Sequence, residues 1–231
     1  MNRGSPRRFF VTGTDTGVGK TRCAAALCRA LAARGLAVAA MKPIASGCER
    51  TADGLRNGDA LALQAAMTVR ARYDEVNPYA FEPPIAPHVA ARRSGVRIDL
   101  AHLDHAFERL ALRSDTLVVE GAGGWRVPVT DEVEFADLAA RWSLQVILVV
   151  GLKLGCINHA LLAQESVLHR QLGFAGWICN RIDPHMPEAQ ASIETLRRRL
   201  IAPCLGDLPW APGETADLAG RRLEVDQLAG T

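Results

Sequence analysis

Aromatic residues, long apolar runs and charge of a single sign are all scarce in this chain of 231 residues. Phe, Trp and Tyr make up 5% of it, and its apolar runs, such as residues 146–150, are far shorter than the ~20 residues that span a bilayer. The net charge is only +2 at pH 7, and the arginines fall in scattered pairs and triplets that suit solvated faces. The composition therefore disfavours both a membrane-spanning protein and a nucleic-acid-binding protein, which would need a basic stripe.

Closely spaced cysteines are also absent, although the chain contains six. No two form a C-x-x-C pair or another short metal-ligand spacing, and most stand among apolar residues. We therefore expect buried free thiols in a reducing compartment. The basic residues 1–8 lead directly into an apolar segment, without the small-residue cleavage site of a secretory signal. Together these features predict a cytoplasmic protein.

The most informative segment is GTDTGVGKT at residues 13–21, which follows an apolar run and opens an Ala- and Leu-rich helical pattern. Small residues let backbone N–H groups turn inward around a polyphosphate, and the start of a helix adds the positive end of its dipole. Lys20 would then reach the β- and γ-phosphates, and the Thr21 hydroxyl would ligate Mg²⁺. The segment predicts a protein that binds a nucleoside triphosphate.

This loop departs from the usual phosphate-loop pattern in its spacing. Thr14 stands where the first glycine is usual, so Gly13 is separated by five residues, instead of four, from the GKT at 19–21. The competing interpretation is a turn rich in glycine and threonine that contains GKT by chance. The flanking strand and helix patterns favour the phosphate loop.

Strand-like and helix-like patterns alternate along the sequence. Strands are expected at residues 8–12, 37–41, 116–120, 145–150, 174–179 and 204–208, and helices at 20–34, 59–66, 100–113, 135–142, 157–171 and 188–200. Residues 78–87 are expected to form a proline-interrupted loop. This alternation predicts an α/β, three-layer P-loop NTPase fold: a mainly parallel central sheet with helices on both faces. The length suits one such domain over residues 1–231.

Polar residues stand at or just after the ends of four predicted strands, namely Lys42, Glu120, Lys153 and Asn180, and Pro209 follows the last strand. The carboxyl ends of parallel strands meet at one edge of a sheet, beside the phosphate loop, and ligands bind there. We therefore expect these residues to share one pocket.

Three of the acidic and basic residues have competing interpretations. Glu120 precedes a glycine-rich turn at 121–124 and is suited to hold Mg²⁺ with Thr21, although it could also be a strand-end carboxylate in solvent. Asp59 could be a site residue or no more than the N-cap of its helix. Lys42, between Met41 and Pro43, is a poor core residue and is expected to point into the cleft.

Eight segments carry a resemblance to one family. They are VTGTDTGVGKT at 11–21, KPIASG at 42–47, GLRNGDALALQ at 54–64, VNPYAF at 76–81, VEGAGGW at 119–125, VILVVGLKLGCINHA at 146–160, AGWICN at 175–180 and LGDLPW at 205–210. In these segments the chain resembles the dethiobiotin synthetases of the biotin pathway. The segments follow the family's order across nearly the whole chain, and KPIASG and KLGCINHA are far more specific than a phosphate loop. That family's phosphate loop has the same five-residue spacing.

The resemblance implies that 7,8-diaminopelargonate, CO₂ and ATP give dethiobiotin, ADP and phosphate. In this family one amine captures CO₂ as a carbamate, and the carbamate oxygen attacks the γ-phosphate to form a carbamic-phosphoric anhydride. The neighbouring amine then closes the ureido ring and expels phosphate. Because all these species are anionic, such a site needs cations and N–H donors more than it needs a protein nucleophile.

The resemblance also assigns roles to matching residues. Lys42 becomes the catalytic lysine that holds the carbamate and stabilises the transferring phosphoryl group, with Lys20 on the β- and γ-phosphates. Thr16 and Ser46 would bind the nitrogen and carbamate end of the substrate. The implied Mg²⁺ ligands are Thr21, Asp59 and Glu120. The implied nucleotide-binding residues are Gly17, Val18, Gly19, Lys20, Thr21, Arg22, Asp59, Glu120, Asn180, Arg181, Pro209, Trp210 and Ala211.

The remaining substrate contacts implied by the resemblance lie at Leu154, Gly155, Cys156 and Asn158. In this family the aliphatic carboxylate of the substrate is received at a helix N-terminus contributed by the partner subunit, so a homodimer is expected. From the residues alone, Leu154 and Ile157 could equally be core residues.

Two departures affect this transfer of roles. Gly17 stands where family members can have glutamate, so any carboxylate contact made there is absent. Residues 180–183, NRID, partly resemble the guanine-reading N-K-x-D motif, which leaves the choice between ATP and GTP open.

Two other classes share the glycine-rich loop. An ATPase switch of the partitioning or septum-positioning type generally carries a lysine near the start of the loop, where this chain has Asp15. An amide-forming cobyrinate-type synthetase would need an additional glutaminase domain, for which the chain has no room.

Overall fold

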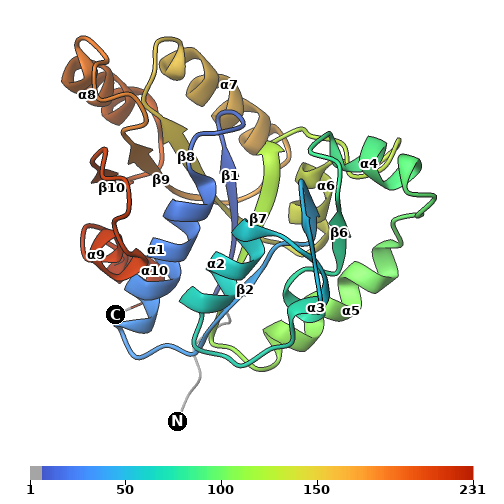
Figure 1. Ribbon diagram of the computed structural model, residues 1–231. Helices are drawn as coiled ribbons and strands as arrows, with labels where there is room; N and C mark the ends of the chain where they lie inside the picture. The colour runs from blue at the N-terminus through green and yellow to red at the C-terminus, as the bar shows by residue number, and fades with distance from the viewer. Residues whose placement is uncertain (1–6, 231) are drawn as a thin grey trace.

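The computed structural model describes residues 7–230, so residues 1–6 of the basic N-terminal segment, and residue 231, lie outside it. Its centre is a six-stranded parallel sheet with the order β10-β9-β8-β1-β7-β2 (Figure 1). The strands are β1 (Arg7–Gly13), β2 (Val38–Met41), β7 (Thr116–Gly124), β8 (Gln145–Gly151), β9 (Phe174–Asn180) and β10 (Cys204–Leu208). The predicted parallel sheet is confirmed, and β7 runs four residues beyond its expected end at residue 120.

Helices cover both faces of this sheet, because alternate strand residues point to opposite sides and both sides are apolar. On one face Phe9 and Val11 pack among residues of α1 (Lys20–Ala32), α2 (Gly58–Ala66), α9 (Ala216–Gly220) and α10 (Asp226–Ala229). On the other face Phe10 packs with α5 (Leu100–Ala111) and α6 (Phe135–Arg141), and Leu148 packs with α7 (Cys156–His169) and α8 (Ala189–Arg199). Within residues 7–230 no helix combines the length and the hydropathy that crossing a membrane would require.

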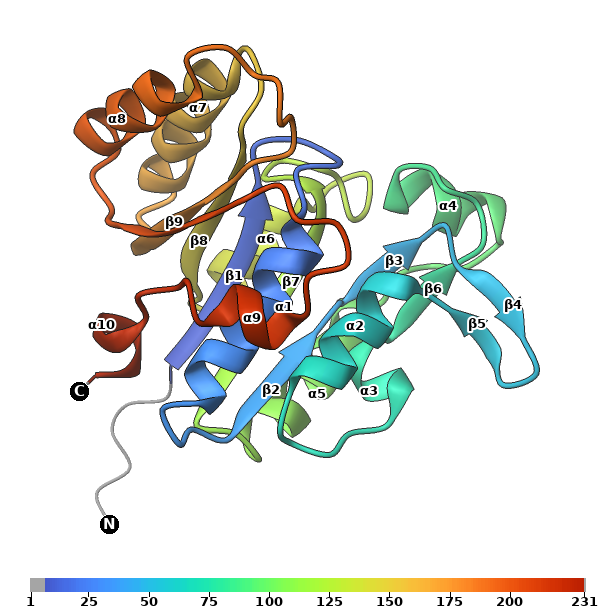
Figure 2. The same cartoon turned by 60° about the vertical axis from the view of Figure 1, so that its left-hand side comes forward.

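Short elements fill the region between β2 and α5, where the sequence pattern is loose. They are β3 (Ile44–Ser46), β4 (Glu49–Thr51), β5 (Gly54–Arg56), α3 (Tyr73–Val76), β6 (Tyr79–Phe81) and α4 (Pro87–Arg93). The expectation of a loop over residues 78–87 is therefore wrong in part, because β6 pairs in parallel with β3 and α4 begins at residue 87. A three-residue strand is too short to produce an alternating pattern. Figure 2 shows the β4–β5 hairpin projecting away from the central sheet.

The connections place the glycine-rich loop at the point where the sheet's strand order reverses. From β1 the chain passes to β2 and β7 on one side and then to β8, β9 and β10 on the other. The loop follows β1 and leads into α1, which starts at Lys20 as expected. The crevice at such a reversal, outside the carboxyl ends of the strands, is where ligands bind in open α/β sheets.

All six cysteines are free thiols, as expected from their spacing. Five are buried, and Cys204 is half-buried. Burial raises the pKa of Cys23 and of Cys28 to about 12, which keeps both thiols protonated and unreactive. Cys48, next to the KPIASG segment, is 4% exposed and therefore has little access to a substrate.

Candidate active site

The glycine-rich loop depends on two glycines with left-handed backbone conformations, Gly17 with φ 76° and Gly19 with φ 81°. Gly19 directly precedes α1, and a Cβ added there would lie 2.2 Å from Nδ2 of Asn180. Only glycine allows this close approach between the loop and the end of β9. The Lys20 ammonium donates a hydrogen bond to the backbone oxygen of Asp15, 3.2 Å away, and so lies across the loop.

A cavity of about 400 Å³ opens beside this loop at the carboxyl edge of the sheet. Its lining residues are Thr16, Gly17, Gly19, Lys20, Thr21, Lys42, Ser46, Asn57, Asp59, Glu120, Ala122 and Gly123. The structure thus brings together the proposed triphosphate, metal and carbamate residues. They come from the phosphate loop, α1, β3, α2 and β7 and from the residue after β2.

Lys42 is the centre of a buried charge cluster in this cavity. Its ammonium lies 2.6 Å from Oε1 of Glu120 and 3.2 Å from Oδ2 of Asp59, and it also donates to the backbone oxygen of Gly121 at 3.1 Å. The Lys42 side chain is 4% exposed and the Glu120 side chain 0%. A strand-end carboxylate in solvent is therefore the wrong interpretation of Glu120.

The two lysines of the cavity differ in their electrostatic setting. Burial opposes the charge on Lys42, but Glu120 and Asp59 outweigh it and raise the pKa of Lys42. Burial, together with the charge of Lys42, lowers the pKa of Lys20. Burial likewise opposes ionisation of Asp59, yet its contacts with Lys42 lower the pKa of that carboxyl. At neutral pH Lys42 and Asp59 therefore form an ion pair.

The oxygen atoms near Thr21 suit a hard divalent cation. The Thr21 hydroxyl donates to Oε1 of Glu120 at 2.9 Å, while the buried Oε2 of Glu120 has no hydrogen-bond partner within residues 7–230. Those residues contain no cluster of three His, Cys, Asp or Glu side chains, so an all-protein metal cage is not present in that range. Two carboxylates and a hydroxyl nevertheless match the partial set of protein ligands that Mg²⁺ takes when phosphates and water supply the rest.

Asp59 is not the N-cap of its helix. Asn57 has that role: its side-chain oxygen accepts hydrogen bonds from the backbone N–H groups of Asp59 and Ala60, at 3.1 and 3.2 Å. The capping interpretation of Asp59 was wrong, because the helix begins one residue earlier and Asn57-Gly58 supplies the cap signal. The Asp59 carboxylate is therefore free to reach Lys42. Asn57 itself, which lines the cavity, was missed by the sequence analysis.

The residues expected to hold the base gather at the end of β9 and the segment after β10. Asn180, the last residue of β9, contacts the phosphate loop: its Nδ2 donates to the backbone oxygen of Val18 at 2.8 Å. Arg181 instead pairs with Asp207 of β10, at 2.7 Å. The turn after β10 leaves Trp210 52% exposed between Pro209 and Ala211.

The partial likeness of residues 180–183 to a guanine reader is not matched by their contacts. The Asp183 carboxylate, which would have to accept hydrogen bonds from guanine, accepts one from the backbone N–H of His185 at 2.9 Å and is exposed. The Asp183 carboxylate therefore stabilises the turn at residues 183–185.

The start of α7 presents a mixed surface near the glycine-rich loop. Leu154 is 95% exposed, so the core interpretation of this residue was wrong, whereas Cys156 is buried. Gly155, with φ 93°, precedes the helix, and Asn158 is exposed. Lys153 binds Asp15 of the glycine-rich loop at 2.7 Å, and this ion pair fixes the start of α7 beside the loop.

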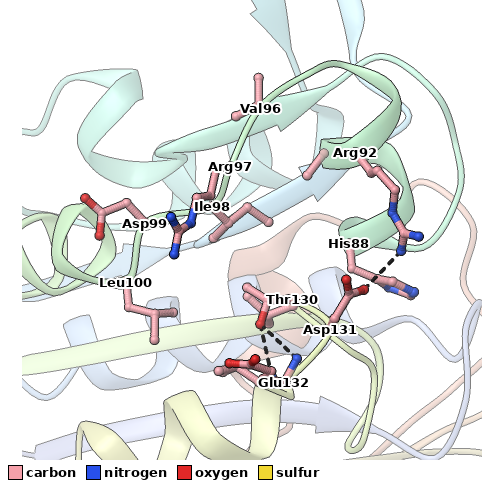
Figure 3. A pocket seen from close by; sticks show the side chains of 13 residues that line it. His88, Arg92, Val96, Arg97, Ile98, Asp99, Leu100, Thr130, Asp131 and Glu132 are labelled. Carbon is pink, nitrogen blue, oxygen red and sulfur yellow. Dashed lines mark hydrogen bonds and ion pairs between the residues drawn. The ribbon is translucent and has the colours of Figure 1, made fainter.

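A larger cavity, of about 920 Å³, lies elsewhere, between α4, the start of α5 and the segment 129–133 (Figure 3). One ion pair lies in its lining, between Arg92 and Asp131 at 3.0 Å. The Thr130 hydroxyl oxygen accepts the backbone N–H groups of Glu132 and Val133. None of the residues predicted for the active site lines this cavity, so size alone does not identify the site.

Comparison with known proteins identifies the family of this chain. A family model described as an AAA domain matches residues 7–217. The ATP-dependent dethiobiotin synthetase BioD of Pseudomonas paraeruginosa is 55% identical over 202 residues, which cover 87% of this chain and 89% of that protein. The protein of the same name from Pseudomonas aeruginosa (strain UCBPP-PA14) is 54% identical over 221 residues, covering 95% of this chain and 97% of that protein.

A solved structure confirms the fold. The septum site-determining protein MinD from Pyrococcus horikoshii, solved in complex with Mg-ADP, matches with a TM-score of 0.57 over 98% of both chains. Its sequence identity is only 18%, so this likeness concerns the architecture alone. The identity to the curated relatives is about three times higher and extends over nearly the whole length. This chain belongs to the ATP-dependent dethiobiotin synthetase family.

Proposed function

We propose that this protein uses ATP to join CO₂ to 7,8-diaminopelargonate and close the ureido ring of dethiobiotin, releasing ADP and phosphate. The observation that carries the proposal is the position of Lys42. Its buried ammonium shares one cavity with the glycine-rich loop and with Ser46. A site that only hydrolysed ATP would have no need of this second cation opposite the loop.

The chemistry proceeds in three balanced steps. One substrate amine attacks CO₂, loses a proton and becomes a carbamate. A carbamate oxygen attacks the γ-phosphorus of ATP, the bond to the β-phosphate oxygen breaks, and ADP leaves. The second amine attacks the carbonyl carbon of the resulting anhydride, loses a proton and expels phosphate as the ring closes. Each step places negative charge between the phosphate loop and Lys42.

Lys42 acts in these steps as a fixed cation and not as a base. Its two carboxylate neighbours raise its pKa, so the ammonium remains protonated. Its three N–H donors contact Glu120, Asp59 and Gly121, so in the proposed complex it exchanges one of these oxygens for a carbamate or phosphoryl oxygen. Preorganised donors in a site shielded from water stabilise developing charge more than water does, because they need no reorganisation. Thr16 and Ser46, in the same cavity, hold the nitrogen and carbamate end of the substrate within reach of Lys42.

Lys20 and the loop backbone hold the other reactant. Lys20 is 7% exposed and lies at the N-terminus of α1, where the helix dipole favours anions. In the proposed complex the ammonium exchanges its backbone contact with Asp15 for the β- and γ-phosphate oxygens. The phosphate chain is thereby aligned with the carbamate, and this alignment supplies much of the catalysis.

Thr21, Asp59 and Glu120 would hold Mg²⁺, as the unpartnered Oε2 of Glu120 and the oxygen-only donor set support. Bound there, Mg²⁺ supplies charge neutralisation for the β- and γ-phosphates. Asp59 and Glu120 also position the Lys42 ammonium by direct contact, so each carboxylate serves both the metal site and the lysine.

Replacing Glu120 by glutamine is expected to raise the Mg²⁺ concentration needed for half-maximal activity by about tenfold or more, because a charged ligand becomes neutral. The measurement is a Mg²⁺ titration of ATP consumption at saturating substrate. Glu82→Gln is the matched control, since Glu82 is exposed and pairs with Arg50 on the β4–β5 hairpin. An unchanged metal titration for the Glu120 variant would remove Glu120 from the metal site.

The proposal includes a homodimer in which the start of α7 receives the aliphatic carboxylate of the partner's substrate. The exposed side chain of Leu154, just before α7, and the 55% exposed Leu162 within α7 support it, since both are apolar surfaces that a second subunit could cover. The exposed backbone around Gly155 and Asn158 offers N–H groups to a carboxylate.

The function is tested by following ATP consumption with and without diaminopelargonate and bicarbonate, and by detecting dethiobiotin by mass spectrometry. The synthetase consumes ATP only when both are present and forms one cyclic urea per ATP. A partitioning-type switch would hydrolyse ATP without them. The Asp15–Lys153 pair argues against the switch, because it fills the place of the lysine that such proteins generally carry early in the loop.

A further inference from the structure

Four side chains form a continuous set of hydrogen bonds beside the expected base site. Arg22 of α1 donates from Nη1 to Oδ1 of Asn180 at 2.6 Å and from Nη2 to Oε2 of Glu214 at 2.6 Å. Glu214 accepts a further bond from Nε of Arg222 at 3.2 Å. This network ties the end of β9 to α1 and to the segment that follows β10.

Glu214 is the anchor of the network. Its side chain is 7% exposed and lies between two arginines, and its backbone N–H donates to the oxygen of Ala211 at 3.1 Å. The hydrogen bond from Arg22, with that from Arg222, lowers the pKa of Glu214, so the carboxylate stays charged at neutral pH. Arg22 is thereby held with Nη2 on Glu214 and Nη1 on Asn180, and its planar guanidinium fixes the directions of both hydrogen bonds.

The network decides which way the Asn180 amide faces. Arginine can only donate and a carbonyl oxygen can only accept, so Arg22 fixes the position of Oδ1 and the backbone oxygen of Val18 fixes that of Nδ2. Within residues 7–230 the side-chain hydrogen bonds of Asn180 leave one lone pair of Oδ1 and one N–H of Nδ2 unused. That pair of groups matches the N6 donor and N7 acceptor of adenine, whereas guanine presents two acceptors, O6 and N7.

We propose that Arg22, held by Glu214, is a positioning residue that makes the site select adenine over guanine by locking the Asn180 amide. The inference rests on the proposed use of a nucleotide at this site but not on the identity of the second substrate. It answers the choice between ATP and GTP that residues 180–183 leave open. Arg22 acts through Asn180 and has no need to touch the base.

The test compares Arg22→Ala with the wild-type protein in the ratio of kcat/KM for ATP to that for GTP. A well-oriented amide pair discriminates between bases by about tenfold or more, and the ratio is expected to fall by that factor. The KM for the diamine should stay unchanged. Arg29→Ala is the matched control, because Arg29 also links α1 to the C-terminal segment, through Asp217 at 3.6 Å, and the structure shows no contact between it and Asn180.

A double-mutant cycle shows whether Arg22 works through Asn180. Asn180→Ala alone should lower the ATP/GTP ratio, and adding Arg22→Ala to it should lower the ratio no further. Equal losses for ATP and GTP in Arg22→Ala, or an unchanged ratio, would overturn the inference. If Arg22→Ala does not fold, Arg22→Met replaces it, since methionine keeps much of the apolar stem but has no N–H donor for either partner, and the ratio should fall in the same direction.

Binding measurements separate this inference from the proposed function. Calorimetry with ADP and GDP alone, without diamine or bicarbonate, should show a preference for ADP that Arg22→Ala removes and Arg29→Ala retains. That result supports the inference even if no dethiobiotin is formed. Equal affinity of the wild-type protein for ADP and GDP would overturn the inference and leave ring closure untouched.

Discussion

Replacing Lys42 by alanine is expected to lower kcat for dethiobiotin formation by about 10²- to 10³-fold, the loss that follows removal of one preorganised donor. Nucleotide affinity should change little, because the phosphates are held by the glycine-rich loop and Lys20. The reason is the position of the ammonium: it lies beside Glu120 and Asp59, where the proposed function places the carbamate charge. Steady-state kinetics and calorimetry with an ATP analogue make the comparison.

The same substitution should also affect stability. Glu120 is 0% exposed, and removing its cationic partner leaves a buried carboxylate uncompensated, a change that costs about 3 kcal/mol or more. Thermal unfolding of the variant is therefore needed beside the kinetics, and Lys42→Met, which conserves most of the side-chain volume, separates loss of charge from loss of packing. Equal losses in turnover and in nucleotide affinity would move Lys42 from the catalytic to the binding residues.

Replacing Lys20 by alanine should damage nucleotide binding and turnover together. In the proposed function the ammonium contacts the phosphates in both the ground state and the transition state, so we expect ATP affinity to fall by about tenfold or more and kcat/KM by about 10³-fold. Arg29→Ala, in the same helix but outside the cavity, should retain wild-type values. Near-normal turnover of the Lys20 variant would contradict the role of the loop.

Lysine occurs at only three positions in the sequence, 20, 42 and 153, and all other strongly basic residues are arginines. All three lie at the carboxyl edge of the sheet, on or beside the cavity. A compact ammonium on a flexible stem suits a site where one cation must exchange a protein oxygen for a phosphate or carbamate oxygen, whereas a planar guanidinium would be held in a fixed fork. The restriction of lysine to these three positions is consistent with a specific role for each of them.

The central sheet could be predicted because its strands are buried on both faces and therefore form short apolar runs, several of which are followed by a polar residue. The ends of these runs predicted that Lys42 and Glu120 lie at the same edge of the sheet, and the structure shows the two side chains in contact. The same pattern could not predict β3 and β6, because three-residue strands carry no periodic signal and are held by their pairing with each other.

Contacts between distant parts of the sequence were beyond prediction for a different reason. Arg22 and Asn180 are separated by 158 positions, and nothing in either local pattern indicates that their side chains meet. The choice between a capping role and a site role for Asp59 could have been made from the local sequence, because Asn57-Gly58 is itself a good N-cap signal. That choice required the start of the helix to be known within one residue. Side-chain pairing thus follows from the fold, and not from motifs.

The central claim is that a carbamate oxygen attacks the γ-phosphate of ATP in this cavity, and isotope transfer tests it most directly. Purified protein is supplied with diaminopelargonate, ATP, Mg²⁺ and ¹⁸O-labelled bicarbonate, and the released phosphate is analysed by mass spectrometry before exchange with water dilutes the label. The account predicts one ¹⁸O atom from CO₂ in each phosphate released with dethiobiotin. Unlabelled phosphate, formed at the same rate without the diamine, would contradict it.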